Sequence, residues 1–496
     1  MSVLINPRPY QREAVYQLIP DAFRQGHTSI IRYAPMRSGK SIEQALMAKG
    51  AYEKGNRVIL LTHRSKIFRS TLHHLSNQGV PCVDFTAGKK MPAGDWKVML
   101  AMERTLWNVI RKNPETILQP NLILVDEIHL NNFSKIIDFF ISRGKVFIVA
   151  FSGTPKGKHL HKYFSKIIFN VDSIDLIATG DLVRCMAFQM EDKEINQVKK
   201  DKGEFDNNEM FKHYNKANRY DGLISEYKEK VNGQKGIVFC CNIEHTVKTY
   251  NRFKEEGINA FMCHSGNKNF PMTEKESDEM INAFEYSSDG VMINQGKLDT
   301  GYDHPPMMWV AVDRATTSLQ LWLQMASRAA TPYKGKTFYT LLDFGMNHNR
   351  HGLVHQPRTW TLDPPKKRKE QPAAVKTCPS CGAMLYATVR VCEFCKYEFP
   401  KPTHELKEGV MVEVNTDIPL GLIGKRISEL SLEELIKCQR TKKFKHTYIW
   451  RVLRSKDEGA LLGEYAKSMG YKNGWLFSER KKIQDGEVGF KDYIIR

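Results

Sequence analysis

The chain has 496 residues, 41% of them hydrophobic, which predicts two large folded domains with smaller modules and excludes a wholly disordered chain. Its formal net charge of +19 favours a polyanionic partner such as nucleic acid, and the alternative is a basic protein without one. No apolar run approaches the roughly 20 residues that a membrane helix needs, and the N-terminal sequence lacks a signal-peptide pattern. We therefore expect a soluble, cytoplasmic protein with no membrane association.

Five short apolar runs in the first part of the chain are typical of buried parallel strands. They lie at 29–33, 58–61, 98–101, 122–125 and 146–150. The segments between them are amphipathic, and one of these predicts a helix at about 40–52. Strands that alternate with helices predict a doubly wound α/β domain over residues 1–180.

Residues 181–215 are polar and charged, so we expect a connector or insertion there. The apolar runs then resume. They lie at 236–240, 260–263, 290–293, 309–312 and 337–342. The simplest interpretation is a second α/β domain over residues 216–345.

The rest of the chain divides into three predicted modules. Residues 346–375 form a basic, Pro-containing linker, whose Lys366-Lys-Arg-Lys369 favours phosphate contact over the alternative of a nuclear signal. A four-cysteine module follows at 376–402. Residues 403–496 are predicted to be a basic, mainly helical module, in which Ser431-Leu-Glu-Glu434 is a capping box that opens a helix.

Ala34-Pro-Met-Arg-Ser-Gly-Lys-Ser41 is typical of a phosphate-binding loop, because it follows a predicted strand and opens a predicted helix. Lys40 would reach the β- and γ-phosphates of ATP, and the hydroxyl of Ser41 would bind Mg²⁺. The usual first glycine of such loops is Ala34 here, so a chance match is the alternative. The residues predicted to hold the nucleotide are Pro35, Met36, Arg37, Ser38, Gly39, Lys40 and Ser41.

Asp126 and Glu127 follow the apolar run 122–125, at the strand end where ligands of α/β domains bind. Asp126 suits the shell of Mg²⁺, and Glu127 suits a base that positions the attacking water. His129 either relays between the nucleotide and the second domain or is a structural histidine at the strand end.

Asp126-Glu-Ile-His129 resembles the Asp-Glu-x-His box of superfamily-2 helicases, and the other boxes of that family follow in order. The matching segments are Arg8-Pro-Tyr-Gln11 (adenine reading), Thr62-His-Arg64 (strand tracking), Ser152-Gly-Thr154-Pro (coupling), His264-Ser265-Gly266, Asp299-Thr300-Gly301-Tyr-Asp303, and Gln324-Met-Ala-Ser-Arg328. The resemblance covers about residues 7–345. It implies two RecA-like domains, with ATP and Mg²⁺ in the cleft between them and a nucleic-acid strand across their top.

The resemblance also implies a role for each matching residue. It implies catalysis by Lys40, Asp126, Glu127, His129, Gln324 and Arg328. It implies further nucleotide contacts at Arg8, Gln11, Gly301 and Asp303. It implies nucleic-acid contacts at Thr62, Arg64, Arg104, Ser265 and Thr300, and coupling through Ser152 and Thr154.

The last box departs from the family pattern, because Thr331 stands where a second arginine is usual. Arg328 is therefore assigned the transition-state role of an arginine finger, with Arg314 as a nearby substitute.

A narrower resemblance extends past residue 345. The segments 341–345 and 350–352, the Pro-rich linker and the cysteine module are similar to RadD-like helicases, which are bacterial DNA-repair ATPases with relatives in bacteriophages. Residues 465–475 resemble a tail of the phage relatives. This resemblance favours DNA over RNA as the partner, a bacterial or phage-infected host cytoplasm, and a single-strand-binding or other replication or repair protein as a second partner.

Two Cys-x-x-Cys pairs, separated by ten residues, predict a structural Zn²⁺ site of four thiolates. The ligands are Cys378, Cys381, Cys392 and Cys395. The alternatives are a redox pair and a rubredoxin-type iron centre. A module this small has too little apolar area to fold alone, so the metal should stabilise it.

The segment 437–456 carries eight Lys or Arg residues and no acid, with Phe444, Tyr448 and Trp450 interleaved. Cations and aromatic rings together are typical of single-strand binding, in which rings stack on bases. An ordinary helix with its aromatic side chains in a core is the alternative.

The sequence thus predicts an ATP-dependent DNA helicase or translocase. A second hypothesis is an ATPase that remodels protein–DNA complexes without unwinding. A third is a binding scaffold that acts through the cysteine module and tail, with a weak motor. A fourth, the motor subunit of a restriction enzyme, would need a nuclease motif or a nuclease partner, and the sequence contains no convincing nuclease motif. Strand polarity and oligomeric state are not predicted.

Overall fold

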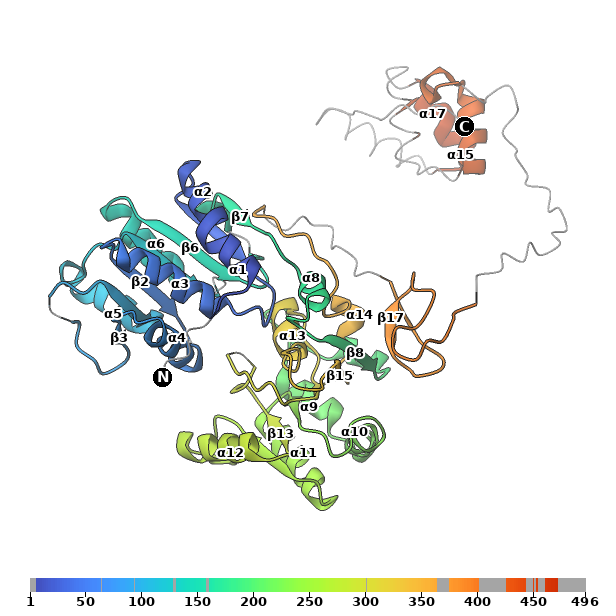
Figure 1. Cartoon of the computed structure of the whole chain (residues 1–496). Helices are drawn as coiled ribbons and strands as arrows, with labels where there is room; N and C mark the ends of the chain where they lie inside the picture. Colours follow the sequence, from blue (N-terminus) through green and yellow to red (C-terminus); the bar gives the residue numbers. More distant parts are fainter. Residues whose placement is uncertain are drawn as a thin grey trace. The chain divides into compact units, whose positions relative to one another are not determined.

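The computed structural model describes residues 6–63, 65–92, 94–127, 131–157, 160–299, 301–363, 374–400, 425–442, 449, 452–453 and 460–471. The chain forms two compact units, Met1–Phe399 and Pro400–Arg496. The first unit contains two lobes, each built on its own sheet (Figure 1).

The first lobe is a seven-stranded sheet in which every neighbouring pair is parallel. The strand order is β3 (Val83–Phe85), β4 (Val98–Met102), β2 (Val58–Thr62), β5 (Leu122–Asp126), β6 (Phe147–Ser152), β1 (Ser29–Tyr33) and β7 (Lys166–Ile168). The central strands are buried along their whole length, which explains why they appear in the sequence as continuous apolar runs. The predicted doubly wound domain is confirmed, and β3 and β7 are additional edge strands.

Helices cover both faces of the first sheet, and each face has its own apolar core. On one face, α5 (Glu103–Lys112) and α6 (Asn131–Arg143) contribute side chains such as Leu106 and Phe133. On the other face pack α2 (Ile19–Arg24), α3 (Lys40–Glu53) and α4 (Ser65–Asn77). Short elements complete the lobe: α1 (Pro9–Glu13), the π-helical turn Ala14–Leu18, the 3₁₀ turn Pro114–Thr116 and α7 (Leu160–Tyr163).

The second lobe is an eight-stranded sheet. Its order is β12 (Ala260–Cys263), β13 (Val291–Asn294), β11 (Gly236–Cys240), β14 (Trp309–Asp313), β15 (Phe338–Asp343), β8 (Arg184–Gln189), β17 (Met384–Tyr386) and β16 (Val375–Thr377). The strands from β12 to β8 are parallel, and β17 and β16 are antiparallel to their neighbours. The predicted second α/β domain is confirmed.

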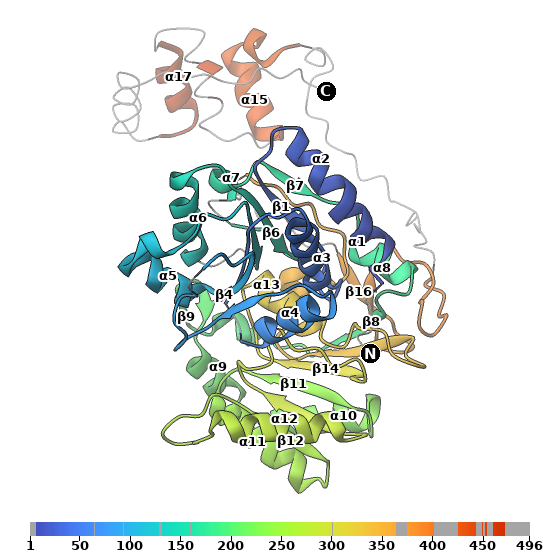
Figure 2. The same cartoon turned by 60° about the vertical axis from the view of Figure 1, so that its left-hand side comes forward.

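Helices also cover both faces of the second sheet, as Figure 2 shows. The packing side chains of α8 (Ser173–Ala178), α12 (Glu274–Tyr286) and α13 (Leu319–Ala326) belong to one core. Those of α10 (Ala217–Lys230) and α11 (Ile243–Glu255) belong to the other.

The predicted connector at 181–215 is wrong in part, because β8 pairs with β15 and so belongs to the second sheet. Only one of the six β8 residues is fully buried, so the apolar signal of this strand is weak. The rest of the segment folds into a 3₁₀ turn (Lys193–Gln197), a hairpin of β9 (Lys200–Asp201) and β10 (Glu204–Phe205), and α9 (Asn207–Tyr214). These elements share a small core that includes Phe205 and Met210.

After α14 (Asn347–His351), the chain leaves the second lobe and returns to the first. Val354 packs in the core of the second lobe, whereas Leu362 packs against the core of the first. We call residues 352–362 the strap. The cysteine module follows, and its β17 continues the second sheet through Met384, which pairs with Ala187.

The second unit has a small helical core. It contains α15 (Leu432–Lys442) and α17 (Ala460–Ser468), preceded by the 3₁₀ turn Ile427–Glu429. The predicted capping box is confirmed, because the backbone N–H of Glu434 donates to Ser431 Oγ (3.2 Å) and the N–H of Ser431 donates to Glu434 (2.7 Å). Phe444, Tyr448 and Trp450 of the basic segment lie outside the described residues. Among the helices that the structure describes, none has the length and apolarity to cross a bilayer.

Candidate ATP site and metal module

The phosphate-binding loop turns into α3 at Gly39, which adopts a left-handed backbone with φ of +80°. A Cβ atom at this position would lie 2.9 Å from the amide nitrogen of Gln11, so both the conformation and the space require glycine. Lys40 is the first residue of α3 and Ser41 the second. The predicted strand–loop–helix arrangement is confirmed, and the backbone N–H groups of the helix start lie where anions bind.

Two side chains from α1 support the loop. The hydroxyl of Tyr10 donates to the carbonyl of Ser38 at 2.5 Å, and the amide of Gln11 donates to the carbonyls of Ser38 (3.0 Å) and Gly39 (3.2 Å). Gln11 is 1% exposed. Arg8 forms an ion pair with Asp181 at 3.0 Å. The structure therefore gives Gln11 a role in holding the loop, and its contact with adenine stays a prediction.

A buried ion pair fixes α3 to the sheet. Arg32 of β1 donates to both carboxylate oxygens of Glu43, at 2.8 and 2.9 Å, and also to Asn170 at 2.7 Å. Both charged side chains are fully buried. Burial raises the pKa of Glu43, although Arg32 opposes this effect. The sequence signal for this pair was an arginine inside an apolar strand, and our sequence interpretation missed it.

Lys40 and the acidic pair come together at the carboxyl end of the first sheet. Glu127 Oε1 lies 3.6 Å from Lys40 Nζ, and Glu127 has a left-handed backbone with φ of +55°. Asp126 Oδ1 accepts a hydrogen bond from Gln44 of α3 at 3.0 Å. A φ this positive is uncommon for a residue other than glycine and is frequent at functional sites. His129 lies outside the described residues.

The second lobe contacts Glu127 through a residue that sequence reasoning missed. Gln320 of α13 donates from Nε2 to Glu127 Oε2 at 3.3 Å. The predicted residue, Gln324, lies one turn further along α13 and is 9% exposed. Helical spacing of four residues could have identified Gln320, because positions 320 and 324 lie on the same side of a helix.

Arg328 lies just after α13 and is buried at the interface between the lobes. It donates to the carbonyl of Tyr302 at 2.6 Å and to the carbonyl of Asp299. Burial lowers its pKa well below the usual value, and the nearby Arg37 adds to this effect. Thr331, where the second arginine is expected, donates to Asp303 at 2.9 Å.

Arg37 of the phosphate-binding loop joins the two lobes. It donates to the carbonyl of Tyr302 at 2.5 Å and forms an ion pair with Asp303 at 3.2 Å. Gly301 lies nearby, and a Cβ atom there would come within 2.7 Å of Ile67 in α4. Gly301 and Asp303 were predicted to contact the nucleotide, and the structure shows that they lie against the first lobe. The alternative arginine, Arg314, donates instead to Asn207 of α9 at 3.3 Å.

The predicted coupling residues lie next to the phosphate-binding loop. The N–H of Thr154 donates to Ser152 Oγ at 3.0 Å. A Cβ atom on Gly153 would lie 3.0 Å from the side chain of Met36. Because Met36 and Gly153 pack this closely, a movement of the phosphate-binding loop would displace the segment from Ser152 to Thr154.

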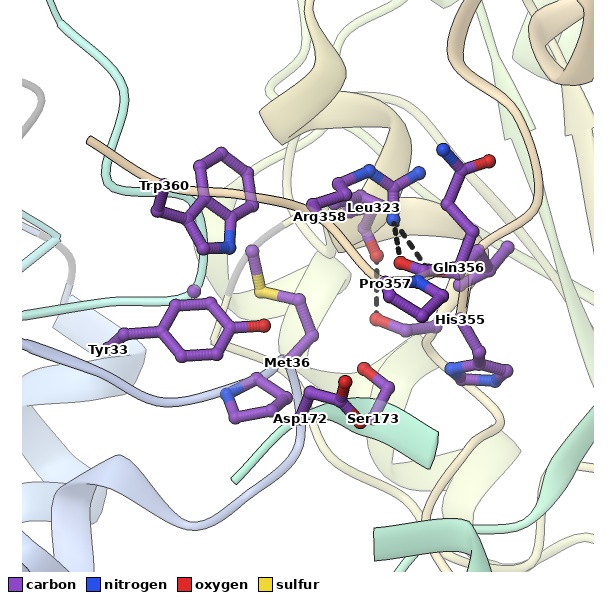
Figure 3. Close-up of a pocket in the computed structure, with 14 residues that line it drawn as sticks. Tyr33, Met36, Asp172, Ser173, Leu323, His355, Gln356, Pro357, Arg358 and Trp360 are labelled. Atoms are coloured by element: carbon purple, nitrogen blue, oxygen red, sulfur yellow. Dashed lines mark hydrogen bonds between the residues drawn. The ribbon is translucent and has the colours of Figure 1, made fainter. Parts of the chain in front are cut away.

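Figure 3 shows a cavity that is lined by Met36 of the phosphate-binding loop, Leu323 of α13 and residues of the strap. Gly153 also lines it. Its volume of about 20 Å³ suits one or two waters and is too small for a nucleotide. Arg358 stabilises the strap by donating to four carbonyls, those of His351, Leu353, Val354 and Gln356. Trp360 then packs against Tyr33 of the first lobe, with ring centroids 5.9 Å apart.

The predicted nucleic-acid contacts follow the carboxyl ends of strands. Thr62 ends β2 and is buried, Arg104 lies at the start of α5 after β4 and is exposed, and Ser265 follows β12 and is exposed. Arg64 and Thr300 lie outside the described residues. Their contact with nucleic acid stays a prediction.

The four cysteines of the module converge. Their sulfur atoms all lie within 4.8 Å of one another, with Cys378 and Cys395 at 3.6 Å and Cys381 and Cys392 at 3.8 Å. Four thiolates at the Zn–S distance of about 2.3 Å would be separated by about 3.8 Å in a tetrahedron. Gly382 has a φ of +73°, as the tight turn after the first pair requires. The residues therefore fit a tetrahedral metal site.

The module is attached to the second lobe by side chains as well as by β17. Arg184 of β8 forms an ion pair with Glu393 at 2.8 Å. Phe338 of β15 makes an edge contact with Phe394, with centroids 6.1 Å apart. Both contacting residues of the module lie between the second pair of cysteines.

Residues 4–157 match the family model of the Type III restriction enzyme res subunit. The "51.5 kDa protein" of Lactococcus phage (isolate 7-9) is 26% identical over 373 residues, which cover 74% of this chain and 77% of the phage protein. The putative mitochondrial ATP-dependent helicase irc3 of Schizosaccharomyces pombe is 24% identical over 378 residues, which cover 72% of this chain and 60% of the yeast protein.

Among solved structures, a fragment of a putative HsdR subunit of a type I restriction enzyme from Vibrio vulnificus YJ016 superposes with a TM-score of 0.53 at 14% identity. The match covers 69% of this chain and 65% of that chain. At this identity it supports the fold alone. The ordered boxes, the two RecA-like lobes and these matches are consistent with a superfamily-2 helicase, and the sequence matches support an ATP-hydrolysing enzyme.

Proposed function

We propose that the protein is an ATP-dependent DNA helicase or translocase that couples ATP hydrolysis between its two lobes to movement along a strand. The observation that supports this most is the position of Glu127. Its carboxylate lies between Lys40 of its own lobe and Gln320 of the other, at 3.6 and 3.3 Å. A base held from both sides would be assembled only when the lobes are together, which is what a motor requires.

The residues of the site divide the chemistry among them. Lys40 would hold the β- and γ-phosphates of ATP, and Glu127 would orient the attacking water. Ser41 and Asp126 would hold Mg²⁺, which supplies positive charge against the phosphate oxygens. Arg328 would approach the γ-phosphate from the second lobe after it leaves the carbonyls that it now contacts.

DNA is the proposed partner for two reasons. The net charge of +19 favours a polyanion. A phage protein is among the relatives, and the resemblance of the segments after residue 340 to RadD-like proteins favours DNA. Thr62, Arg104 and Ser265 would contact the strand's backbone without reading bases. The proposed cofactor of the cysteine module is Zn²⁺.

The test is ATP hydrolysis with single-stranded DNA, duplex DNA, forked DNA and RNA at a stated salt concentration. We expect stimulation by DNA, and loss of at least a hundredfold in kcat for Lys40→Ala and Glu127→Gln. Lys54→Ala, at the exposed C-terminal end of the same helix, is the control. Full DNA-stimulated activity in either site variant would refute the mechanism. Negligible ATP turnover with every DNA and RNA tested would favour the scaffold hypothesis.

The alternative within the same class is an ATPase that remodels protein–DNA complexes without unwinding. The same ATP site serves both activities. A strand-displacement assay beside a protein-displacement assay separates them, since a remodeller removes a bound protein and leaves the duplex intact.

A further inference from the structure

Helix α13 brings Gln320 of the second lobe to Glu127, and the position of this helix therefore matters for hydrolysis. Gln320 lies in the first turn of this helix. Its amide donates to Glu127 Oε2 at 3.3 Å, on the opposite side of the carboxylate from the 3.6 Å contact of Oε1 with Lys40. A displacement of α13 by about 1 Å away from Glu127 would break this hydrogen bond.

The start of α13 is held by a residue from the insertion between the lobes. Glu204 of β10 accepts hydrogen bonds from the hydroxyl of Thr316 (2.9 Å) and from the backbone N–H groups of Thr317 (2.9 Å) and Ser318 (3.2 Å). The hydroxyl of Thr317 also donates to the carbonyl of Gly203 at 2.7 Å. Ser318 is the N-cap of α13, and its hydroxyl accepts from the N–H of Leu321 at 3.2 Å.

Glu204 is well suited to this role. A carboxylate accepts several hydrogen bonds at once, and bonds from backbone N–H groups to a charged oxygen are stronger than neutral ones. The negative charge also lies near the N-terminus of α13, where the helix dipole favours it. The hairpin that carries Glu204 packs through Phe205 into a core shared with α9 and Ala315. This packing therefore holds the backbone of Glu204 in place.

We propose that Glu204 and Gln320 are positioning residues for ATP hydrolysis. Glu204 fixes the start of α13, and α13 then presents Gln320 to Oε2 of Glu127, which fixes the orientation of the carboxylate that would position the attacking water. This inference rests on the proposed function, because it assigns Glu127 the role of orienting that water. According to this inference, the β9–β10 hairpin influences the ATP site by fixing the position of α13.

The first test compares Gln320→Leu and Gln320→Glu with the wild type. Gln320→Leu is expected to lower the DNA-stimulated kcat about tenfold and to leave KM for ATP within about twofold, since Gln320 orients the base and does not bind ATP. Gln320→Glu replaces the amide donor with a second carboxylate, which cannot donate to Glu127 and repels it. Its kcat should fall at least as far as that of Gln320→Leu, again with KM for ATP within about twofold.

Gln234→Glu is the matched control, because it adds the same charge on an exposed turn at the opposite end of the second sheet. Its kcat and its KM for ATP should match those of the wild type. A helix that merely braces the lobe would lower kcat and raise KM for ATP together in the Gln320 variants. That result, or unchanged kcat in both Gln320 variants, would overturn the proposal.

The second test is a double-mutant cycle between Glu204→Gln and Gln320→Leu, with Thr316→Val as a milder change at the same contact. If Glu204 acts through Gln320, the double variant loses no more kcat than Gln320→Leu alone. If the two losses multiply, the residues act independently and the relay is wrong. Asp201→Asn, on the same hairpin, is the control and should behave as wild type.

Thermal melting of every variant accompanies the cycle, so that loss of folding is not counted as loss of positioning. The two proposals also fail differently. If the wild type shows no DNA-stimulated hydrolysis, the proposed function fails. If the wild type is active and Lys40→Ala is not, unchanged kcat in the Gln320 and Glu204 variants refutes this inference alone.

Discussion

At the scale of single residues, the ATP site depends on backbone conformations that few residue types adopt. Gly39 and Glu127 both have a positive φ. Gly39 directly precedes Lys40 in sequence, and the carboxylate of Glu127 lies 3.6 Å from the Lys40 amine. Glycine adopts such a conformation without strain, whereas a residue with a side chain is strained there by about 1–3 kcal/mol. Gly39 therefore adopts the left-handed conformation without strain, whereas Glu127 is strained in it.

Gly39→Ala should therefore weaken nucleotide binding about tenfold, because it adds strain and pushes a Cβ atom to within 2.9 Å of the Gln11 amide. Titration with a fluorescent ATP analogue measures the change. Gly50→Ala is the control, since Gly50 lies inside α3 with nothing within 4 Å of the added atom. That change should raise the free energy of unfolding by about 0.5–1 kcal/mol and leave binding unaltered. Equal binding by both variants would contradict the expected role of the loop.

His355 of the strap should make stability depend on pH. Burial, and then the neighbouring Arg358, lower its pKa to about 4. Its ring packs edge-on against Tyr339, with centroids 6.2 Å apart. Because this pKa lies below the usual value of about 6.5, the neutral ring stabilises the fold fully above pH 6.5. That contribution falls as the pH is lowered toward 4.

The measurement is the difference in melting temperature between the wild type and His355→Phe at several pH values. As the pH falls from 7 to 4.5, the melting temperature of the wild type should fall relative to that of His355→Phe, because phenylalanine cannot acquire a proton. His161→Gln, at an exposed position of α7, is the control. A difference that stays constant over this range would show that His355 is not the titrating group.

At the scale of elements, strands buried along both faces were the most predictable part of the chain. The runs at 29–33 and 236–240 match β1 and β11 residue for residue. The strand β8 was missed because its sheet face is only partly buried, so it lacks an apolar run. Contacts such as Arg32–Glu43 and Gln320–Glu127 join residues far apart in sequence, and a local pattern cannot specify such pairs. The motif residues were therefore predictable, while the residues that hold them in place were not.

The cysteine module should depend on its metal for its fold. Its buried core is small and consists of Cys378, Leu385 and Cys392. Purified protein is expected to contain about one equivalent of zinc, and Cys381→Ser should lose it. Elemental analysis gives the metal content, and proteolysis between residues 376 and 402 reports the loss of structure. Cys82→Ser, in the first lobe, should retain the zinc. Iron in place of zinc would support the rubredoxin-type alternative.

At the scale of the whole first unit, the two lobes are joined by a few contacts that lie close to the ATP site. Arg37 reaches the second lobe, Gly301 lies against α4, and the strap packs Trp360 on Tyr33. The contacts of Arg37 are polar, and domains joined by polar contacts can move relative to one another. Closure of the lobes is therefore expected to respond to single substitutions at this interface.

Arg37→Gln should shift the lobes toward a more open arrangement. The change removes the ion pair with Asp303 and weakens the bond to the carbonyl of Tyr302, and it relieves Arg328 of a neighbouring positive charge. Dyes placed at Ile141 of α6 and Tyr286 of α12, which are both exposed, report the separation of the lobes by energy transfer. Without nucleotide, transfer should be lower in Arg37→Gln than in the wild type. Arg24→Gln removes an exposed ion pair within the first lobe and should leave transfer unchanged. A distribution identical to that of the wild type would mean that Arg37 does not hold the lobes together, and that its role is confined to the nucleotide.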